Sequence, residues 1–255
     1  MKIYALIPAR AGSKGLPDKN ILEVDGHPLI AYSIAFARQL AIDRIIVSTD
    51  SAAYCDIALR YGADCPYLRG TSASGDTAQE AEILADLAAN LPTHAIPLPD
   101  IWIWLKPVNP FRSLDAVQEA LRILVARPAA DSVRIVSEAD ARLHCVGDDG
   151  FLRPYGPGWD ATLSKMPRSR FPKVYQPYNL EVFRHQGWVD RYGLFMGTRI
   201  VPIVAPKITG LDIDDRDTFE IAKALIEMRP RPHVVARHIH LSSADPGQRH
   251  GSSPK

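Results

Sequence analysis

A basic, glycine-containing loop near the start of the chain has the residue types that bind phosphate. In "IPARAGSKGLPDKN", residues 7–20, Arg10, Lys14 and Lys19 supply positive charge directly after a strand-like apolar run. Residues 11–15 can present consecutive backbone N–H groups to an anion, because glycine lets a phosphate approach the main chain closely. The loop therefore indicates a polyphosphate site, and a solvated basic turn is the alternative interpretation.

The loop fits neither of the two common phosphate-binding motifs. A Walker loop has the pattern G-x-x-x-x-G-K-[ST], whereas Lys14 here precedes the second glycine, Gly15. A Rossmann fingerprint opens directly into a helix, whereas Pro17 and a further strand-like segment follow this loop. Neither motif therefore explains the concentration of positive charge.

Two aspartates near the last regular segment have the spacing of a divalent-cation site. Asp212 and Asp214 in "LDID" occupy alternate positions of an expected strand end, so both carboxylates face the same side. Two carboxylates this close are unfavourable unless a cation lies between them, and oxygen ligands suit Mg²⁺. The alternative is that an aspartate caps the following helix, which is the interpretation we favour for Asp215 and Asp217.

Further polar residues lie where expected strands end and helices begin. Asp50 ends the run "RIIVSTD" and can either cap the next helix or lie near a nucleotide. In "SGDTA", residues 74–78, Asp76 or Thr77 can cap a helix. A capped helix whose amino end faces a ligand satisfies the structural and the functional interpretation together.

Apolar runs alternate with helical patterns over most of the chain. The expected strands are "KIYALIPA", "RIIVSTD", "IWIWLKP", "DSVRIVS" and "TRIVPIVAP", and the expected helices span residues 28–40, 51–61, 77–90, 113–126 and 215–228. This alternation is typical of an α/β fold with a doubly wound, mostly parallel sheet, which binds its ligands at the carboxyl ends of the strands.

Two stretches depart from this alternation. Residues 139–197 are rich in proline, glycine and aromatic residues and show no clear helix. This predicts an inserted region within a domain spanning 1–228, and hairpins are one form that such a region takes. Its large aromatic side chains predict a dimer contact that completes a substrate site. Arg168, Arg170 and Lys173 lie in it, and a solvated face is the usual outcome for such charges. Residues 229–255 have few apolar anchors and are expected to be a disordered tail.

Composition excludes several classes of protein. The 255 residues have a formal net charge of +1, so no overall field attracts nucleic acid or an anionic membrane. The apolar runs are too short for a membrane helix, and no signal peptide is recognisable, which predicts a cytoplasmic protein. Cys55, Cys65 and Cys145 are odd in number and widely spaced. We therefore expect buried thiols in a reducing compartment rather than disulfides or a zinc site.

The motifs together resemble those of the CMP-sialic acid synthetase family, the acylneuraminate cytidylyltransferases. "IPARAGSKGLPDKN" is similar to the signature of this family, and the later motifs follow in the family's order: "GHPLIAYSIAFA", "RIIVSTDS", "YGAD", "LRG…SGDTA", "LKPVNPFR" and "LDIDDRDTFEIAKAL". The resemblance covers about residues 2–228. It implies a nucleotide-diphosphosugar transferase fold, usually dimeric, that uses CTP, Mg²⁺ and a sugar acid.

The resemblance also implies roles for the matched positions. Arg10 and Lys19 would contact the phosphates of CTP and stabilise charge as pyrophosphate leaves, and Asp212 and Asp214 would be the metal-binding D-x-D. These four are the expected catalytic residues. The expected nucleotide-binding residues are Ala9, Arg10, Ala11, Gly12, Ser13, Lys14, Asn20, Asp50, Ser74, Asp76 and Thr77. The expected substrate-binding residues are Lys106, Asn109, Arg168, Tyr175 and Tyr178.

The sugar half departs from the family pattern. The family usually has Gln-Pro-Thr-Ser-Pro where this chain has Lys106 to Pro110, and an Asn-Gly pair where it has Tyr178-Asn179. The Gln-rich segment that follows the family's arginine is Ser169-Arg170 here, although Arg168 and Pro172 fit the family's R-x-x-x-P. A related 3-deoxy-2-ulosonic acid is therefore as good a candidate substrate as sialic acid.

The expected reaction joins CTP and a 2-keto-3-deoxy sugar acid to give the CMP-sugar and pyrophosphate. The anomeric hydroxyl would attack the α-phosphate, and catalysis would rest on positioning and electrostatics. Two alternatives remain: a nucleotidyltransferase of the same fold for another sugar or nucleotide, and a catalytically silent nucleotide- or sugar-binding protein.

Overall fold

The computed structural model describes residues 1–75, 77–155, 165–186, 195–228 and 239. The side chains of Arg168, Tyr178 and Asn179 are outside this description, although their backbone is within it. Ile239 of the expected disordered tail is half-buried and packs against the core, which contradicts the expectation at this residue. The rest of the tail lies outside the described residues, where disorder stays a prediction.

A mixed sheet of six strands forms the centre of the molecule. Its order is β10-β6-β9-β5-β1-β4, in which β9 runs antiparallel to both neighbours and the other strands are parallel. The strands are β1 (Ile3–Pro8), β4 (Arg44–Ser48), β5 (Ile101–Leu105), β6 (Ser132–Ala139), β9 (Val174–Arg184) and β10 (Ile200–Val204). The expected mostly parallel α/β sheet is thus confirmed, and all five expected strands are in it.

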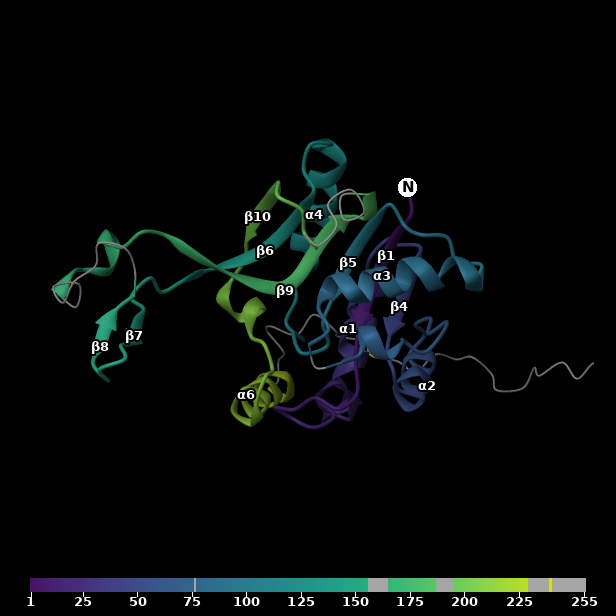
Figure 1. Cartoon of the computed structure of the whole chain (residues 1–255), viewed down its shortest axis with the longest axis horizontal. Helices are drawn as coiled ribbons and strands as arrows, with labels where there is room; N and C mark the ends of the chain where they lie inside the picture. Colours follow the sequence, from purple (N-terminus) through teal and green to yellow (C-terminus); the bar gives the residue numbers. More distant parts are fainter. Residues whose placement is uncertain (76, 156–164, 187–194, 229–238, 240–255) are drawn as a thin grey trace, which may run out of the picture.

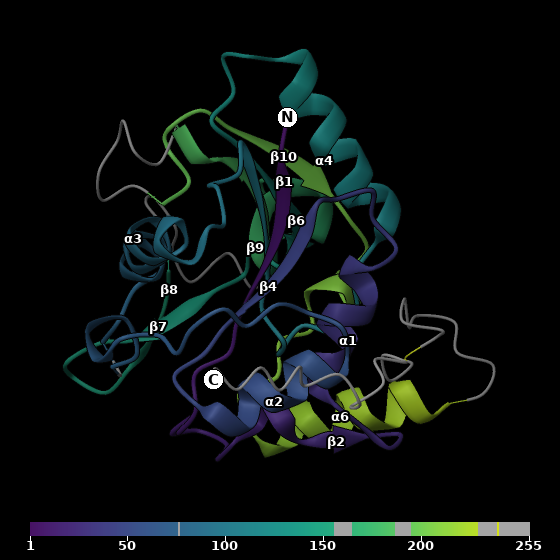
Figure 2. The same ribbon diagram turned by 90° about the vertical axis from the view of Figure 1, so that its right-hand side faces the viewer.

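Helices cover both faces of this sheet (Figure 2). Helices α1 (Leu29–Ala37), α2 (Ala52–Arg60) and α4 (Leu114–Ala126) pack on one face through a core that includes Ile7, Ile103 and Val182. Helix α3 (Glu80–Asn90) packs on the opposite face against Leu6 and Trp104. Successive strand residues point to opposite faces, so alternate apolar residues of β1 and β5 belong to two separate layers of core, one on each face. The sheet is therefore doubly wound.

Helix α6 (Arg216–Glu227) forms a smaller core beside the sheet. It packs with α1 and with the short pair β2 (Glu23–Val24) and β3 (His27–Pro28). Short 3-10 helices connect the larger elements: η1 (Lys19–Ile21), η2 (Thr71–Ala73), η3 (Pro92–His94), η5 (Arg168–Arg170) and η6 (Lys207–Gly210). This arrangement brings the end of the described chain back next to the first loop.

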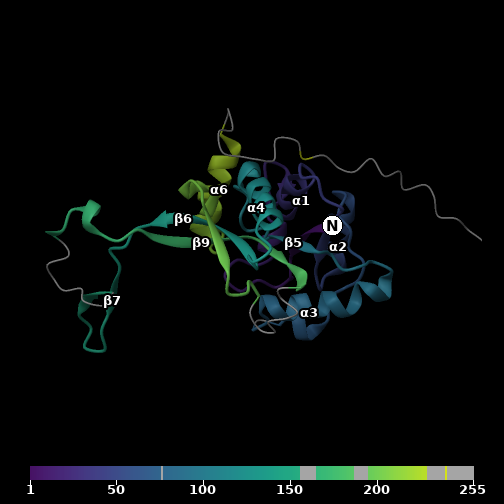
Figure 3. The same cartoon turned by 90° about the horizontal axis from the view of Figure 1, so that it is seen from above.

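Residues 139–197 are not wholly an insertion. The expected hairpin exists as β7 (His144–Val146) and β8 (Leu152–Pro154), at the end of an arm that projects from the body (Figures 1 and 3). However, β9 returns along β6 from Val174 and then enters the main sheet between β5 and β6. The prediction of a separate region is wrong for this strand, because its polar positions Glu181 and Arg184 hide the alternation of a buried strand.

The helix starts confirm the expected cap at Asp215, whereas Asp217 lies in the first turn of α6. Ser51 accepts a hydrogen bond from the Tyr54 amide at 3.4 Å, and Ser113 and Asp215 cap α4 and α6 in the same way. Asp50 is not a cap, because Ser51 takes that position in α2. Helix α3 begins at Glu80 with Gln79 as its cap, so the expected start at Thr77 is wrong.

The cysteines differ from expectation. Cys55 in α2 and Cys65 form a disulfide across a Cα–Cα distance of 5.6 Å, and Cys145 is exposed on β7. Their separation of ten residues hid the pairing, because only the folded turn after α2 brings them together. The cysteine pattern therefore no longer supports the expected reducing, cytoplasmic location. Among the helices that the structure describes, none combines the length and apolar character needed to cross a bilayer.

Candidate active site

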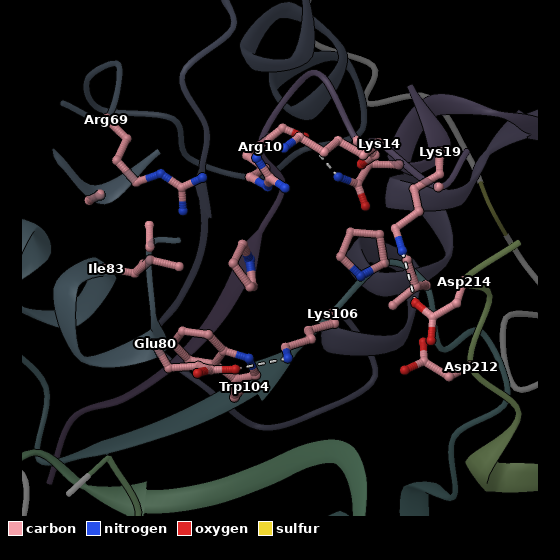
Figure 4. A pocket seen from close by; sticks show the side chains of 18 residues that line it. Arg10, Lys14, Lys19, Arg69, Glu80, Ile83, Trp104, Lys106, Asp212 and Asp214 are labelled. Carbon is pink, nitrogen blue, oxygen red and sulfur yellow. Dashed lines mark hydrogen bonds and ion pairs between the residues drawn. The ribbon is translucent and has the colours of Figure 1, made fainter. Parts of the chain in front are cut away.

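A cavity of about 470 Å³ opens where β1 and β5 end at their carboxyl termini (Figure 4). This is the edge at which a doubly wound sheet binds its ligands. The cavity is lined by Pro8, Arg10, Ser13, Lys14, Gly15, Lys19, Asn20, Arg69, Ala73, Ala78, Glu80, Ile83, Trp104, Lys106, Pro107, Val108, Asp212 and Asp214. Its walls thus join the basic first loop, the start of α3, the end of β5 and the segment before α6.

Hydrogen bonds from Asp50 and Asn20 fix the backbone of the first loop. Asp50, directly after β4, accepts a hydrogen bond from the Ala11 amide at 2.8 Å. Asn20 donates from Nδ2 to the Arg10 carbonyl at 3.0 Å. Gly12 has a φ of 69°, in the region that favours glycine. These contacts fix the backbone so that Arg10, Ser13 and Lys14 line the cavity.

The loop also touches the acidic segment far along the chain. A side chain at Gly15 would place its Cβ at 2.8 Å from the Asp214 carbonyl oxygen, so glycine alone allows this approach. Lys19 donates from Nζ to Asp214 Oδ1 at 3.1 Å and to the Ile213 carbonyl at 3.2 Å. The positive loop and the aspartates therefore form one continuous wall.

Asp212 and Asp214 both line the cavity, as expected, but from an irregular segment rather than a strand end. Ile213 between them is fully buried, and its amide donates to the Val108 carbonyl at 2.9 Å. The alternation that the sequence predicted is therefore present without a β-strand. Two carboxylates on one cavity wall suit the oxygen-rich coordination of Mg²⁺, so these residues fit the expected ion.

A buried arginine lies behind the aspartates. Arg112 is only 1% exposed, its guanidinium lies over the Phe36 ring, and its Nη2 donates to the Lys106 carbonyl. Burial lowers the pKa of Arg112 to about 9, and the negative charge of Asp212 opposes that shift. Arg112 therefore supplies positive charge behind the acidic wall and holds the backbone at Lys106.

Arg69 forms the wall opposite the aspartates and was missed from the sequence (Figure 4). It is 5% exposed, its Nε donates to Ser74 Oγ at 3.2 Å, and its Nη1 has no hydrogen-bond partner among the described residues. Burial lowers the pKa of Arg69, and the carboxylates of Asp50 and Asp86 oppose that shift. Because Arg69 lines the cavity, its guanidinium is suited to donate to an acceptor on a ligand.

The floor of the cavity carries an ion pair. Lys106, just after β5, donates from Nζ to Glu80 Oε1 of α3 at 3.0 Å, beside Trp104 and Ile83 (Figure 4). Burial alone would raise the pKa of Glu80, but the charge and hydrogen bond of Lys106 bring it below its usual value. Lys106 is thus directed into the cavity rather than away from it.

The predicted site residues divide into four groups. Those lining the cavity are Arg10, Ser13, Lys14, Lys19, Asn20, Lys106, Asp212 and Asp214. Ala9, Ala11, Gly12, Asp50 and Ser74 brace these residues from behind or beside them. The positions that do not line it are Thr77, Asn109 and Tyr175. Asp76 and the side chains of Arg168 and Tyr178 lie outside the described residues.

Two of the predicted substrate-binding residues lie away from the lining of this cavity. Asn109 is buried and donates to the Thr209 carbonyl at 3.0 Å, so it joins two segments of the chain instead of reaching a ligand in this cavity. Tyr175 lines a second cavity, of about 890 Å³, at the base of the arm. The predicted contacts of Asn109 and Tyr175 with substrate are therefore not supported at the first cavity of this single chain.

The glutamate, the tryptophan and the arginine of the cavity wall were missed for different reasons. Glu80 lies within a helix pattern and Trp104 within an apolar strand, where each residue type has an ordinary structural explanation. Arg69 had a signal, because it stands in "LRG" between an expected strand and helix. A lone arginine in such a connection is usually solvated, and only the fold shows that this one is buried.

Comparison with known proteins identifies the family. Residues 4–136, about half of the chain, match the family model described as Cytidylyltransferase. The chain belongs to the cytidylyltransferase family. The matched part contains the first loop, Arg69, Glu80 and Lys106, and ends within β6.

Known CMP-sugar synthases are similar in sequence to this chain, as the motifs predicted. The chain is 29% identical over 243 residues to N-acylneuraminate cytidylyltransferase of Escherichia coli O18:K1:H7, covering 94% of this chain and 56% of that protein. It is 39% identical over 124 residues to CMP-N,N'-diacetyllegionaminic acid synthase of Legionella pneumophila, covering 48% and 53%. The resemblance to the CMP-sialic acid synthetase family is thus confirmed, and this chain spans about half the length of these relatives.

Solved structures support the fold. CMP:2-keto-3-deoxy-manno-octonic acid synthetase complexed with CTP superposes with a TM-score of 0.61 at 16% identity, covering 89% of this chain and 98% of that one. A 4-diphosphocytidyl-2C-methyl-D-erythritol synthase from Anaerococcus prevotii gives 0.60 at 15% identity, covering 89% and 99%. At these identities the likeness shows a shared nucleotidyltransferase-like fold.

Proposed function

We propose that the protein is an enzyme that transfers the cytidylyl group of CTP to a 2-keto-3-deoxy sugar acid, releasing pyrophosphate. The observation that carries this proposal is the single cavity in which the basic loop, Asp212 and Asp214 meet. A polyphosphate needs cations on one side, and a metal bound to it needs carboxylates on the other. The names of the relatives, which include sialic, legionaminic and pseudaminic acid cytidylyltransferases, support the sugar acid as the second substrate.

The residues of the loop would bind and orient the triphosphate. Arg10 and Lys14 contribute charge from the loop, and Lys19 contributes it from η1, where Asp214 holds its ammonium group in place. These cations would offset the negative charge that develops as pyrophosphate leaves, which is the main requirement for phosphoryl and nucleotidyl transfer. Arg69, whose Nη1 has no hydrogen-bond partner among the residues that the structure describes, would donate to an acceptor atom of the nucleotide.

Asp212 and Asp214 would hold Mg²⁺. The bound ion would neutralise charge on the phosphates of the nucleotide. The two carboxylates would keep their orientation through the buried Ile213 between them and through Lys19, which bonds both the Ile213 carbonyl and Asp214. Arg112 would attract the Asp212 carboxylate from behind, because it places a buried positive charge near it.

A pyrophosphate-release screen tests this function. CTP, UTP, ATP and GTP are each combined with N-acetylneuraminic, N,N'-diacetyllegionaminic, pseudaminic and 3-deoxy-manno-octulosonic acids in the presence of Mg²⁺. We expect release with CTP and at least one acid, and its loss in Lys19→Ala but not in the matched control Lys223→Ala on α6. No release with any pair would refute the function and favour a silent binding protein.

The alternative enzyme of the same fold gives a different result in the same screen. A 4-diphosphocytidyl-2C-methyl-D-erythritol synthase has a comparable TM-score, so the fold alone does not select the acceptor. Release with another nucleotide, or with 2C-methyl-D-erythritol 4-phosphate and none of the acids, would favour that alternative. The positive charge of Lys106 at the cavity floor suits an anionic acceptor of either kind, so the screen decides between them.

We also propose that the protein is a homodimer that uses its arm as the interface. The arm exposes an unusual number of large apolar side chains, namely Leu143, Val146, Phe151, Leu152 and Tyr155. Phe151 is 69% exposed, and the second cavity lies at the base of the same arm. Such a surface usually marks an interface. Sedimentation at micromolar concentration should give a dimer, and Phe151→Asp should weaken it; a monomer of the unaltered protein would contradict the proposal.

A further inference from the structure

Four charged side chains gather below the floor of the cavity, on the sheet face that α3 covers. Lys106 is paired with Glu80 of α3, and Glu181 of β9 lies 3.4 Å from Nη2 of Arg134 in β6. Glu181 stands opposite Trp104 in the β5–β9 register and opposite Arg134 in the β6–β9 register. Residues opposite each other point to the same face, so Glu181 and Arg134 lie on the sheet face of Trp104, next to the cavity but behind the residues that line it.

Glu181 is the unusual member of this group. It is 5% exposed, and buried carboxylates are rare unless they are paired. Burial raises the pKa of Glu181 to about 7; Arg134 and Lys106 lower it, and Glu80 raises it. Arg134 Nε is itself buried without a hydrogen-bond partner among the described residues. The pair is therefore incompletely satisfied by the protein alone.

The net charge of the four residues depends on whether Glu181 is protonated. With Glu181 ionised, two carboxylates face two cations and the group is neutral. With Glu181 protonated, the group has one excess positive charge next to the cavity floor. An anionic ligand at Lys106 favours that second state, because a like charge nearby raises the pKa of a carboxyl group.

We propose that Lys106 and Arg134 form the subsite for the carboxylate of the acid substrate, and that Glu181 is a positioning residue that takes up a proton when this carboxylate binds. The proposal rests on the proposed function and assigns part of its acceptor site. The substrate carboxylate would compete with Glu80 for Lys106 and would meet the Arg134 guanidinium, whose side chain is 28% exposed. The proton comes from solvent, and no covalent bond changes.

The sign of the pH dependence follows from this arrangement. The carboxyl group of a sugar acid is ionised throughout the neutral range, so its own charge does not change there. As pH rises through about 7, Glu181 loses its proton and the subsite loses its excess positive charge. We therefore expect kcat/KM for the acid to fall at least threefold between pH 6 and pH 8, while kcat/KM for CTP changes little through this group.

Glu181→Gln tests the proposal, with Glu119→Gln on the solvent side of α4 as the matched control. The acid selected by the pyrophosphate screen is varied at saturating CTP, and CTP is then varied at saturating acid, from pH 6 to pH 8.5. In Glu181→Gln the fall in kcat/KM for the acid should disappear, whereas Glu119→Gln should keep the profile of the unaltered protein. An unchanged profile in Glu181→Gln would overturn the proposal.

A second pair of variants keeps the test valid if Glu181→Gln does not fold. Arg134→Gln should raise KM for the acid at least tenfold with little effect on KM for CTP, and Arg134→Lys should restore part of the loss. Equal effects on both substrates, or a flat pH profile in the unaltered protein, would overturn the assignment. Absence of turnover with every acid would instead refute the proposed function, and this proposal with it.

Discussion

Replacing Glu181 by glutamine should change how the stability of the protein depends on pH. The side chain keeps its size and can still accept from Arg134, but it no longer titrates. The pKa of Glu181 is about 7 in the fold against 4.5 for the free group. A carboxyl group whose pKa is raised on folding stabilises the native state fully below the free pKa, and this contribution is lost as pH rises through the folded value.

The size of the effect follows from the two pKa values. Between pH 5 and pH 8 the unaltered protein should lose roughly 2.5 kcal/mol more unfolding free energy than Glu181→Gln, since one pKa unit corresponds to about 1.4 kcal/mol. Urea unfolding followed by fluorescence measures this, because Trp102 and Trp104 are buried in the sheet. Glu119→Gln should follow the unaltered protein. Parallel pH curves for Glu181→Gln and the unaltered protein would refute the raised pKa.

Three further predictions concern the nucleotide half and the tail. Arg10→Ala and Lys19→Ala should each lower kcat/KM for CTP tenfold or more, a loss of about 1.4 kcal/mol; unchanged values would exclude the loop from nucleotide binding. The double variant Asp212→Asn, Asp214→Asn should lose activity and keep its circular dichroism spectrum, and full activity of the unaltered protein in excess chelator would exclude the metal. Truncation after Arg231 removes Ile239, which packs against the core, but few other apolar groups follow to offset the entropy of ordering the tail. The melting temperature and activity should therefore change little, and a loss of many degrees would show that the tail docks.

The sequence predicted most of the sheet, because its parallel strands are buried on both faces and appear as continuous apolar runs. "IWIWL" is such a run, and every residue of β5 is buried. β9 could not be recognised in this way. It pairs with β5 and β6 in the middle of the sheet, but it includes an exposed proline, Pro177, and a buried glutamate, Glu181, neither of which the pattern of a central strand favours. Its bulged register against β6 accommodates these residues.

The nucleotide half of the site was predictable because its residues are close together in the chain. The basic residues and glycines of the first loop all lie within residues 7–20, and Asp212 and Asp214 are two positions apart in the sequence. The acceptor half was not, because its members come from separate elements whose order in the sheet the sequence does not give. Arg134 and Glu181 meet only because β9 lies beside β6. Asn109 was assigned to the ligand by its motif, whereas the fold uses it to join two loops.

The phosphate side and the acceptor side of the cavity are held by different kinds of contact, and this difference bears on how each substrate would be recognised. The phosphate side is held by backbone contacts, such as Asp50 to the Ala11 amide and Gly15 against the Asp214 carbonyl, which leave little freedom to change. The acceptor side is held by charge pairs, of which Lys106–Glu80 is partly exposed. A partly exposed ion pair contributes little to stability, so an incoming carboxylate can displace Glu80 at small cost. The charge balance around Lys106 would therefore favour an acceptor that carries a carboxylate, whereas the phosphates of the nucleotide would meet a fixed backbone.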